Sequence, residues 1–354
     1  MRVLITGSEG YIGSRLCPSL AEAGFAVAGL DTGFFRDEHF AVCSPPSVRL
    51  LQRDTRDVQT RDLGNCEALI HMAELSNDPL GEIDPALTNA INFQASARLA
   101  GLAREAGIRR FVYFSSCSVY GKGADELCTE RSETRPQTPY AHAKRLSEAA
   151  ILKLRSSDFA PVILRNATVF GPSPRMRLDL VLNNLAALAW VDKEVRMVSD
   201  GSPHRPLIHV QDLCRAVRLV LDAPAEEVSG EIFNCGDTAL NYRVLEIAAA
   251  VREVFPGCQI TSGGPSPDNR SYRVSFDKIR QRLGFEATRT ALDGAEELRR
   301  LYERLPLTRG HLAGPMFFRC QRVRQLLHDG LLDRELRWTR LSRGHTRAPA
   351  ASAG

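Results

Sequence analysis

The chain has 354 residues, of which 44% are hydrophobic and 25% are charged, and its formal net charge is +4. That length suffices for one large or two modest domains, and no apolar run approaches the roughly 18 residues that a membrane helix needs. The excess charge comes from Arg337, Arg340, Arg343 and Arg347, with no acidic residue after Glu335. It therefore belongs to a tail, and we expect no nucleic-acid or membrane partner. The eight histidines lack metal-ligand spacing, and the nine cysteines include no CxxC pair. These counts predict reduced thiols, a cytoplasmic protein and no metal site.

Apolar runs alternate with helical patterns through the first half of the chain. Strands are expected at 3–5, 26–30, 68–71, 110–114 and 161–164, and helices near 11–23, 86–106 and 139–156. This alternation predicts an α/β fold with a doubly wound parallel sheet of the Rossmann type, whose ligand lies at the carboxyl ends of the strands. From about residue 170 the pattern loosens into proline-rich loops, short helices and a short strand at 232–234.

The first strand leads into three glycines with GxxGxxG spacing, Gly7, Gly10 and Gly13. Glycine here permits a tight turn, lets the backbone approach a pyrophosphate and allows close helix contact, while the helix N-terminus offers free amides. Tyr11 and Ile12 lie within the same loop. We therefore predict that all five residues contact a dinucleotide.

Asp31 ends the second apolar run, about twenty residues after the glycines. A carboxylate at this place accepts hydrogen bonds from a ribose diol and repels a 2′-phosphate. The residue therefore favours NAD over NADP.

Tyr140 and Lys144 are four residues apart on an expected helix, which places both side chains on one face. Lysine is rare in this chain, with five against forty-one arginines. A neighbouring ammonium favours the phenolate and lowers the pKa of a tyrosine, which turns the phenol into a proton-transfer group. The pair therefore predicts an acid–base site.

Together these residues resemble the extended branch of the short-chain dehydrogenase/reductase superfamily, the NAD-dependent epimerases and dehydratases, with a likeness to UDP-glucose 4-epimerases. The resemblance runs from residue 1 to about 300. It implies that Asp54 and Thr55 lie beside adenine and that Ala73, in the segment His71-Met72-Ala73-Glu74, lines the cofactor. It also implies that Asn92 supports the active site from a helix.

The resemblance further implies a catalytic triad of Ser116, Tyr140 and Lys144 and a nucleotide-diphosphate sugar as substrate. In this scheme Tyr140 takes the proton of a sugar hydroxyl, Ser116 hydrogen-bonds the same oxygen, and Lys144 holds the nicotinamide ribose. The predicted substrate-binding residues are Ser118, Thr168, Asn183, Arg205 and Arg270.

Cys117 and Ser118 follow the predicted catalytic serine, where nucleotide-sugar 4,6-dehydratases typically carry Asp-Glu. Without these carboxylates, the simplest outcome is epimerisation through a keto-sugar, most simply at C4. A reductase, a dehydrogenase or an atypical dehydratase on the same scaffold remains an alternative, as does, remotely, a non-catalytic dinucleotide-binding protein. A role of Cys117 as a substitute acid or base also stays open.

The predicted organisation is an NAD-binding domain at 1–169 with a return at about 207–236, and a substrate-binding lobe at 170–206 and 237–310. A helical extension at 311–339 and a disordered tail at 340–354 follow. The helices near 86–106 and 139–156 are apolar over more than one face, which predicts that they pair in a homodimer.

Overall fold

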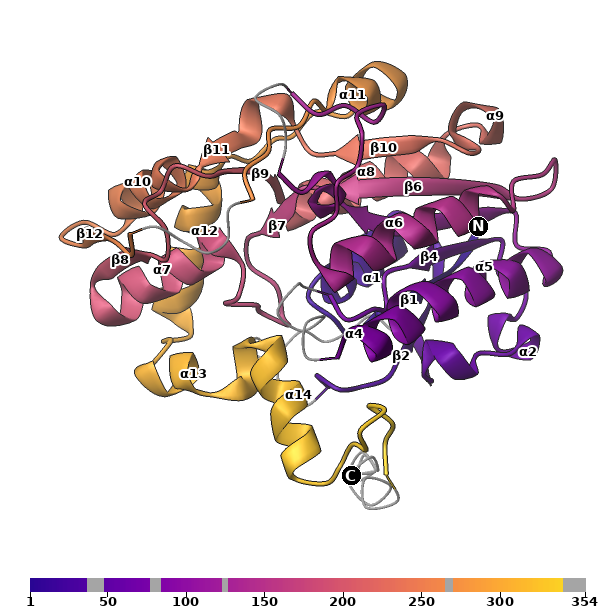
Figure 1. Ribbon diagram of the computed structural model, residues 1–354, viewed down its shortest axis with the longest axis horizontal. Helices are drawn as coiled ribbons and strands as arrows, with labels where there is room; N and C mark the ends of the chain where they lie inside the picture. Colours follow the sequence, from indigo (N-terminus) through magenta and orange to yellow (C-terminus); the bar gives the residue numbers. More distant parts are fainter. Residues whose placement is uncertain (37–47, 77–83, 123–126, 265–269, 340–354) are drawn as a thin grey trace.

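A computed structural model describes residues 1–36, 48–76, 84–122, 127–264 and 270–339, so the predicted tail at 340–354 lies outside the described residues. A seven-stranded sheet of order β10-β6-β5-β4-β1-β2-β3 forms the larger part of the molecule (Figure 1). Each of its ladders is parallel, so the predicted doubly wound sheet is confirmed. The chain order reverses between β1 and β4, which places the ligand crevice at their carboxyl ends. The strands are β1 (Arg2–Thr6), β2 (Ala26–Asp31), β3 (Arg49–Gln52), β4 (Ala68–His71), β5 (Arg110–Ser116), β6 (Ala160–Asn166) and β10 (Ile232–Cys235).

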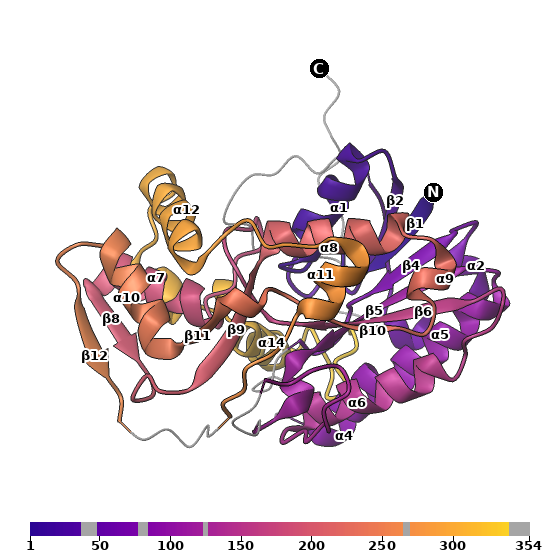
Figure 2. The same cartoon turned by 90° about the horizontal axis from the view of Figure 1, so that it is seen from above.

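Helices cover both faces of this sheet, as the view in Figure 2 shows. On one face α1 (Gly13–Glu22) packs against α8 (Val210–Asp222), and on the other α5 (Ala95–Glu105) packs against α6 (Pro139–Leu152). The helix predicted near 86–106 is interrupted. It consists of α4 (Pro85–Thr88), a π-helical turn at Asn89–Gln94, and α5. Short helices α2 (Thr60–Leu63) and α9 (Ala225–Val228) complete this part.

A smaller lobe lies beside the carboxyl ends of the strands (Figure 1). It contains a three-stranded sheet, β11-β9-β7, and a two-stranded sheet, β12-β8, with helices α7, α10 and α12 packed on one another. The elements are β7 (Thr168–Phe170), α7 (Val181–Asp192), β8 (Glu194–Met197), β9 (His204–His209), β11 (Asn241–Arg243), α10 (Val244–Val254), β12 (Gln259–Ser262) and α12 (Ala291–Arg304). Helix α11 (Asp277–Leu283) packs against β10 of the large sheet. Helices α13 (Arg309–Ala313) and α14 (Arg319–His328) follow the lobe. In the described part of the chain, no helix is long and apolar enough to cross a membrane.

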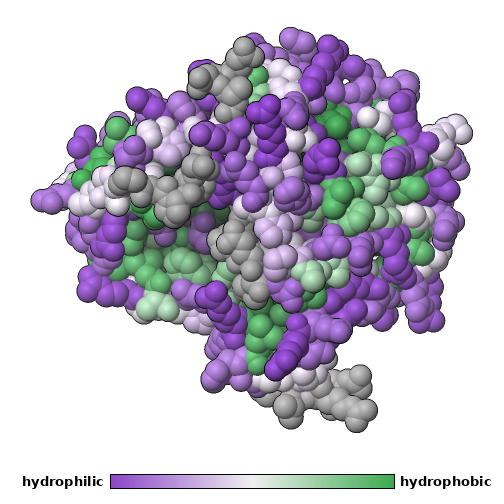
Figure 3. All heavy atoms as spheres, viewed as in Figure 1, coloured by the Kyte–Doolittle hydropathy of each residue, from purple (hydrophilic) through white to green (hydrophobic). Residues whose placement is uncertain are grey.

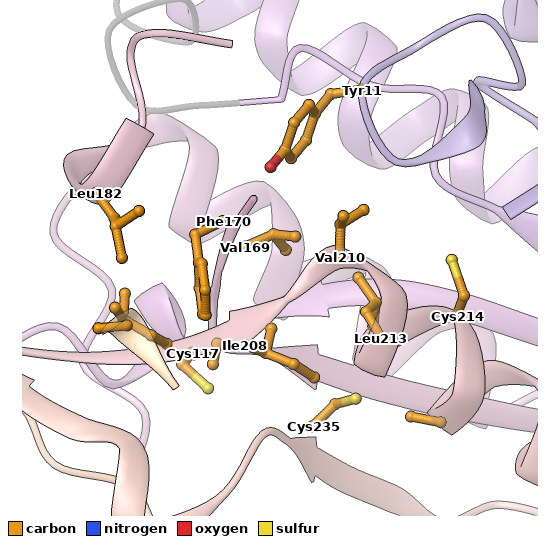
Figure 4. Close-up of a cluster of buried hydrophobic side chains, with 14 of the residues drawn as sticks. Tyr11, Cys117, Val169, Phe170, Leu182, Ile208, Val210, Leu213, Cys214 and Cys235 are labelled. Atoms are coloured by element: carbon orange, nitrogen blue, oxygen red, sulfur yellow. The ribbon is translucent and has the colours of Figure 1, made fainter. Parts of the chain in front are cut away.

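One hydrophobic core joins the lobe to the large sheet. Phe170 of β7 and Ile208 of β9 lie beside Leu213 of α8 and Cys235 of β10 (Figure 4). The Tyr11 hydroxyl donates to the Gly171 carbonyl at 2.7 Å, which fastens the glycine loop to the end of β7. Because these contacts are buried, the two parts hold each other in one position.

A chain of buried hydrogen bonds crosses the carboxyl ends of β1 and β4. The Thr6 hydroxyl accepts from the amides of Met72 and Ala73, both at 3.2 Å, and lies 2.7 Å from Nδ1 of His71. With two amides already donating to it, the hydroxyl donates its own proton to Nδ1. Nε2 of His71 then carries the ring proton toward the Ser96 hydroxyl, 2.7 Å away. His71 is therefore the neutral imidazole, and burial lowers its pKa to about 3.

This buried histidine predicts a loss of stability in acid. Its pKa of about 3 in the folded protein lies below the value of about 6.5 expected for the unfolded chain. Between these two pKa values the imidazole is protonated in the unfolded chain but not in the folded protein. The contribution of His71 to the free energy of unfolding is therefore complete above pH 6.5 and falls as the pH drops. From pH 7 to pH 5 the loss from this residue is about 2 kcal/mol. Urea unfolding of the native chain and of His71→Gln at both pH values measures it.

Other titrating groups act in both proteins, so the difference between the two pH dependences isolates His71. The His71→Gln variant should be less stable at pH 7 but should lose less stability on acidification. Equal losses in the two proteins would contradict the assignment.

Candidate active site

The glycine loop forms a cradle that side chains would block. Gly7 has a φ of +74°, which L side chains rarely adopt. A Cβ atom on Gly13 would lie 2.2 Å from the Gly7 carbonyl oxygen, so this position accepts only glycine. The loop ends at α1, and Gly10, Ile12 and Gly13 at this junction line the crevice. These features fit a dinucleotide diphosphate.

The carboxylate of Asp31 is held at the end of β2 by two backbone amides. Oδ1 accepts from Gly33 at 2.8 Å and Oδ2 accepts from Glu9 at 3.0 Å. Burial raises the pKa of Asp31, although both amides oppose this. Asp31 lies in the wall of the same cavity as the glycine loop. This is the position expected of a residue that binds the ribose of NAD.

Most of the predicted cofactor residues line this one cavity, which also meets the ends of β3 and β4. The Asp54 carboxylate caps the turn at Thr55–Asp57 and forms an ion pair of 2.6 Å with Arg56. Thr55 is buried beside it. The predicted residues found in the cavity wall are Gly7, Gly10, Tyr11, Ile12, Gly13, Asp31, Asp54, Thr55 and Ala73.

Lys144 is buried at the carboxyl end of β5, where its ammonium meets one carbonyl and one carboxylate. Its ammonium donates to the Phe114 carbonyl and lies 2.7 Å from Oε2 of Glu74. The same ammonium lies 5.5 Å from the centre of the Tyr140 ring, one helical turn away on α6. The structure therefore brings together the two members of the predicted acid–base pair.

Glu74 is the unexpected member of this group. Its side chain is 1% exposed, and besides Lys144 it accepts from the Tyr113 hydroxyl at 2.7 Å and the Ser96 hydroxyl at 3.2 Å. Three donors converging on one carboxylate are the arrangement that the ionised form needs. Burial raises the pKa of Glu74, while Lys144 and the hydroxyls oppose that rise. Through Ser96 and His71, the hydrogen-bond chain described above ends on this carboxylate.

Ser116 ends β5, and its hydroxyl accepts from the Ser118 amide at 3.1 Å. Cys117 points the other way: its thiol is 1% exposed and donates to the Arg165 carbonyl at 3.2 Å. Burial raises the pKa of this thiol well above its ordinary value. Cys117 therefore packs as a small buried residue, and these features favour a structural role over an acid–base role.

Two buried polar atoms near Ser116 have no hydrogen-bond partner among the described residues, namely Oγ of Ser118 and Oδ1 of Asn166. Asn166 is the neighbour of Ser116 across the β5–β6 ladder. Buried polar groups are normally satisfied, so atoms of this kind beside a candidate site are suited to a ligand. Sequence reasoning had named Ser118 and missed Asn166, whose only signal was its place at the end of a strand.

Asn92 and Asn183 stabilise the walls of the site. The Asn92 amide exchanges two hydrogen bonds with the backbone of Leu75, at 2.9 and 3.0 Å, and so anchors the segment after β4. The Asn183 amide accepts from Gly171 and donates to the Tyr11 hydroxyl and the Arg177 carbonyl. Both N–H donors of Asn183 are thus engaged within the protein, and its predicted contact with substrate stays a prediction. The resemblance also implied that Asn92 contacts the cofactor, and that contact stays a prediction beside its observed hold on Leu75.

The two arginines predicted to bind substrate meet in the lobe. Arg205 lies in β9, and its guanidinium donates to the Arg270 carbonyl at 2.5 Å. Thr168 begins β7, which pairs with β9. The three predicted residues thus belong to neighbouring parts of the lobe.

Four arginines that were not named as site residues from sequence also line the cavity, Arg53, Arg56, Arg177 and Arg319. Arg177 is buried and pairs with Asp179 at 2.9 Å. Burial lowers the pKa of Arg177, but Asp179 and Tyr140 outweigh this and raise it. Arg177 follows the Gly171-Pro172 loop, which was a usable signal, whereas nothing near Arg319 in the sequence marks it.

Comparison with known proteins supports this geometry. The profile of the NAD dependent epimerase/dehydratase family matches residues 3–236. The chain is 28% identical to a UDP-glucose 4-epimerase of Azospirillum brasilense, over 83% of this chain and 89% of that one. It is 26% identical to a dTDP-glucose 4,6-dehydratase of Streptomyces niveus, over 84% and 91% of the two chains.

A solved structure agrees as well. MoeE5 in complex with UDP-glucuronic acid and NAD superposes with a TM-score of 0.74 at 27% identity, covering 86% of this chain and 99% of that one. The matched profile spans the glycine loop, Asp31, Ser116, Tyr140 and Lys144. The chain is therefore an NAD-dependent enzyme and belongs to the NAD-dependent epimerase/dehydratase family.

Proposed function

We propose that the enzyme is a nucleotide-sugar epimerase, acting most simply at C4 through a transient keto-sugar. The observation that carries this proposal is the identity and orientation of the two residues after Ser116. Cys117 faces the core, and Ser118 offers a buried hydroxyl without a partner among the described residues. Neither supplies the carboxylate that would remove water from a keto intermediate. A reductase, dehydrogenase or atypical dehydratase is the alternative.

Tyr140 is the proposed acid–base group, because it is half-buried and lies one turn from the fixed ammonium of Lys144. The positive charge favours the phenolate, so Tyr140 accepts the proton of a sugar hydroxyl and later returns it. Ser116 would hydrogen-bond the same sugar oxygen. Bound NAD would take up a hydride from the oxidised carbon and return it. The third N–H group of Lys144 would hold the nicotinamide ribose.

The proposed class of substrate is supported by two arginines of the lobe and by the nucleotide sugars named for related proteins. Two related proteins are named for UDP-glucose or dTDP-glucose. MoeE5 has been solved in complex with UDP-glucuronic acid and with UDP-glucose. Arg205 and Arg270 lie together in the lobe, and guanidinium groups bind phosphate oxygens in bidentate fashion. We therefore propose a nucleoside diphosphate sugar whose diphosphate meets these arginines.

The fate of a label on the sugar tests the proposed reaction. The protein as purified is incubated, without added NAD, with a panel of nucleotide sugars that carry deuterium at C4. An epimerase yields the C4 epimer with the deuterium retained, because the hydride returns to the same carbon. Mass spectrometry and NMR of the product measure both. A product lighter by one water would indicate a dehydratase, and a requirement for stoichiometric NAD would indicate a dehydrogenase.

Tyr140→Phe is the control for this experiment. The variant should lower turnover by about a hundredfold or more, the usual effect of losing an acid–base group, while NAD stays bound. Near-normal turnover in Tyr140→Phe would overturn the assigned mechanism even if epimerisation is observed.

Glu74 acts on this chemistry through Lys144. Its negative charge offsets part of the ammonium charge that stabilises the Tyr140 phenolate, so the carboxylate keeps the tyrosine more basic than Lys144 alone would. The other groups around this pair are Tyr113 on β5, the neutral His71 on β4, and Arg177, which interacts with Tyr140 from the loop after β7. Each of them stays in place when only Glu74 is changed.

We predict that Glu74→Gln moves the acidic limb of the pH profile of kcat/KM to lower pH by about one unit. The isosteric amide removes the negative charge, so the uncompensated ammonium lowers the Tyr140 pKa. Tyr113→Phe is the matched control, because it removes one hydrogen bond to the same carboxylate without changing any charge. Its profile should stay within about 0.3 pH units of the native enzyme. A shift of Glu74→Gln to higher pH, or no shift, would contradict this role.

We also propose a homodimer through α5 and α6. These helices pack side by side, and their outer faces carry Ala97, Leu146 and Ala149, with Leu146 40% exposed. Figure 3 shows apolar surface over the region of α6. Apolar side chains on an outer helix face favour burial against a second copy.

Light scattering should return about twice the 39.1 kDa of one chain, and Leu146→Asp should return one chain. The charge would be buried without a partner in the interface, which is unfavourable. Leu245→Asp, at a leucine that is 42% exposed on α10 in the lobe, is the control and should stay dimeric. A monomeric native enzyme at micromolar concentration rules the proposal out.

A further inference from the structure

The segment after the lobe packs against the large sheet in a hydrophobic cluster of its own. Val323, Leu326, Leu332 and Leu336 are buried there with Phe34, Leu75 and Ile91, which follow β2, follow β4 and belong to the π-helical turn. The superposition on MoeE5 covers 99% of the MoeE5 chain but only 86% of this chain. About one seventh of this chain therefore has no counterpart in that structure.

Polar contacts fasten this segment to the adenosine end of the cavity. Trp338 donates from its indole to the Thr32 carbonyl at 2.7 Å, and its ring meets Phe34 edge-on at 5.6 Å. Arg337 forms ion pairs with Asp57 and, at 3.5 Å, with Asp54. These partners follow β2 and β3, directly after Asp31 and beside Thr55. The segment therefore lies outside the place that the adenosine of NAD would occupy.

Helix α14 also contributes to the cavity itself. Arg319 and Val323 line it together with the glycine loop and Arg177. Arg319 is 3% exposed, its guanidinium lies 4.0 Å from the centre of the Phe35 ring, and it donates to the Arg175 carbonyl at 3.4 Å. Stacking on an aromatic ring fixes the plane of the guanidinium. Arg319 interacts electrostatically with Asp179, and it shares this cavity with the loop shaped for a diphosphate, so the guanidinium is placed where the phosphates of the cofactor would lie.

We propose that α14 and residues 329–339 form the outer wall of the dinucleotide site, in which Arg319 binds the phosphates of NAD and the Trp338 anchor slows release of the cofactor. A guanidinium binds phosphate oxygens through charge-assisted hydrogen bonds. The wall covers the adenosine end, so the cofactor leaves only when this segment moves. The inference depends on NAD binding alone and not on which sugar the enzyme converts.

Calorimetric titration of the NAD-free protein with NAD, ADP and adenosine tests the contact of Arg319. Arg319→Met keeps most of the apolar stem and removes the charge. The substitution should weaken the affinities for NAD and ADP by about tenfold or more. It should weaken the affinity for adenosine by less than about twofold, because adenosine has no phosphate. Arg324→Met is the matched control: Arg324 is exposed on the same helix and should leave all three affinities unchanged. Affinities of Arg319→Met for NAD and ADP within about twofold of the native values would overturn the contact.

Trp338→Ala tests the wall with Arg319 left in place. Release of labelled NAD into an excess of unlabelled NAD should become about tenfold faster or more, because the anchor on Thr32 and Phe34 is lost. An unchanged release rate would overturn the proposed wall. If Arg319→Met does not fold, as its thermal unfolding would reveal, Arg319→Gln removes the same charge and takes its place. No sugar is present in either experiment, so failure of the epimerase proposal would leave both results interpretable.

Discussion

The buried ion pair between Lys144 and Glu74 is the contact on which the architecture of the site depends. A lone ammonium at this depth would be unfavourable, and its carboxylate partner makes the position tenable. Glu74 in turn is held by Tyr113 of β5 and, through Ser96 and His71, by Thr6 at the end of β1. Helix α6, which carries Lys144, is thereby fixed in position against the three neighbouring strands β1, β4 and β5. The ion pair, the hydrogen-bond chain and the positions of the strand ends together fix the position of Lys144.

Much of this could be predicted because its signals are local. Glycine spacing, an acidic residue at the end of β2 and a tyrosine four residues before a lysine each depend on a few adjacent positions. The parallel sheet also followed from short apolar runs that alternate with helices, since buried strands are apolar on both faces. For that reason the central strands were found, whereas β3 (Arg49–Gln52) was not: it is a largely exposed edge strand with two leucines between polar residues.

What sequence reasoning missed depends on distant partners. Glu74 stood in a recognised segment, but nothing in that segment shows that its carboxylate reaches a lysine seventy residues later. Asn183 was expected to face substrate, and only the fold reveals that Gly171, Tyr11 and Arg177 take up its amide. The helix near 86–106 carried no mark of the π-helical turn that Asn92 occupies. The contacts of α14 and Trp338 join residues about three hundred positions apart, which no periodicity can indicate.

That separation has a consequence for biosynthesis. The glycine loop and Asp31 leave the ribosome well before Arg319 and Val323, which lie in the wall of the same cavity. Loop closure over such a distance is entropically costly and slow. A nascent chain can assemble β1 to β6 and expose an open crevice long before the segment that closes it exists. Capture of the cofactor in its final form is thus a late event of maturation, because the side of the site that contains Arg319 and Val323 is synthesised about three hundred residues after the glycine loop.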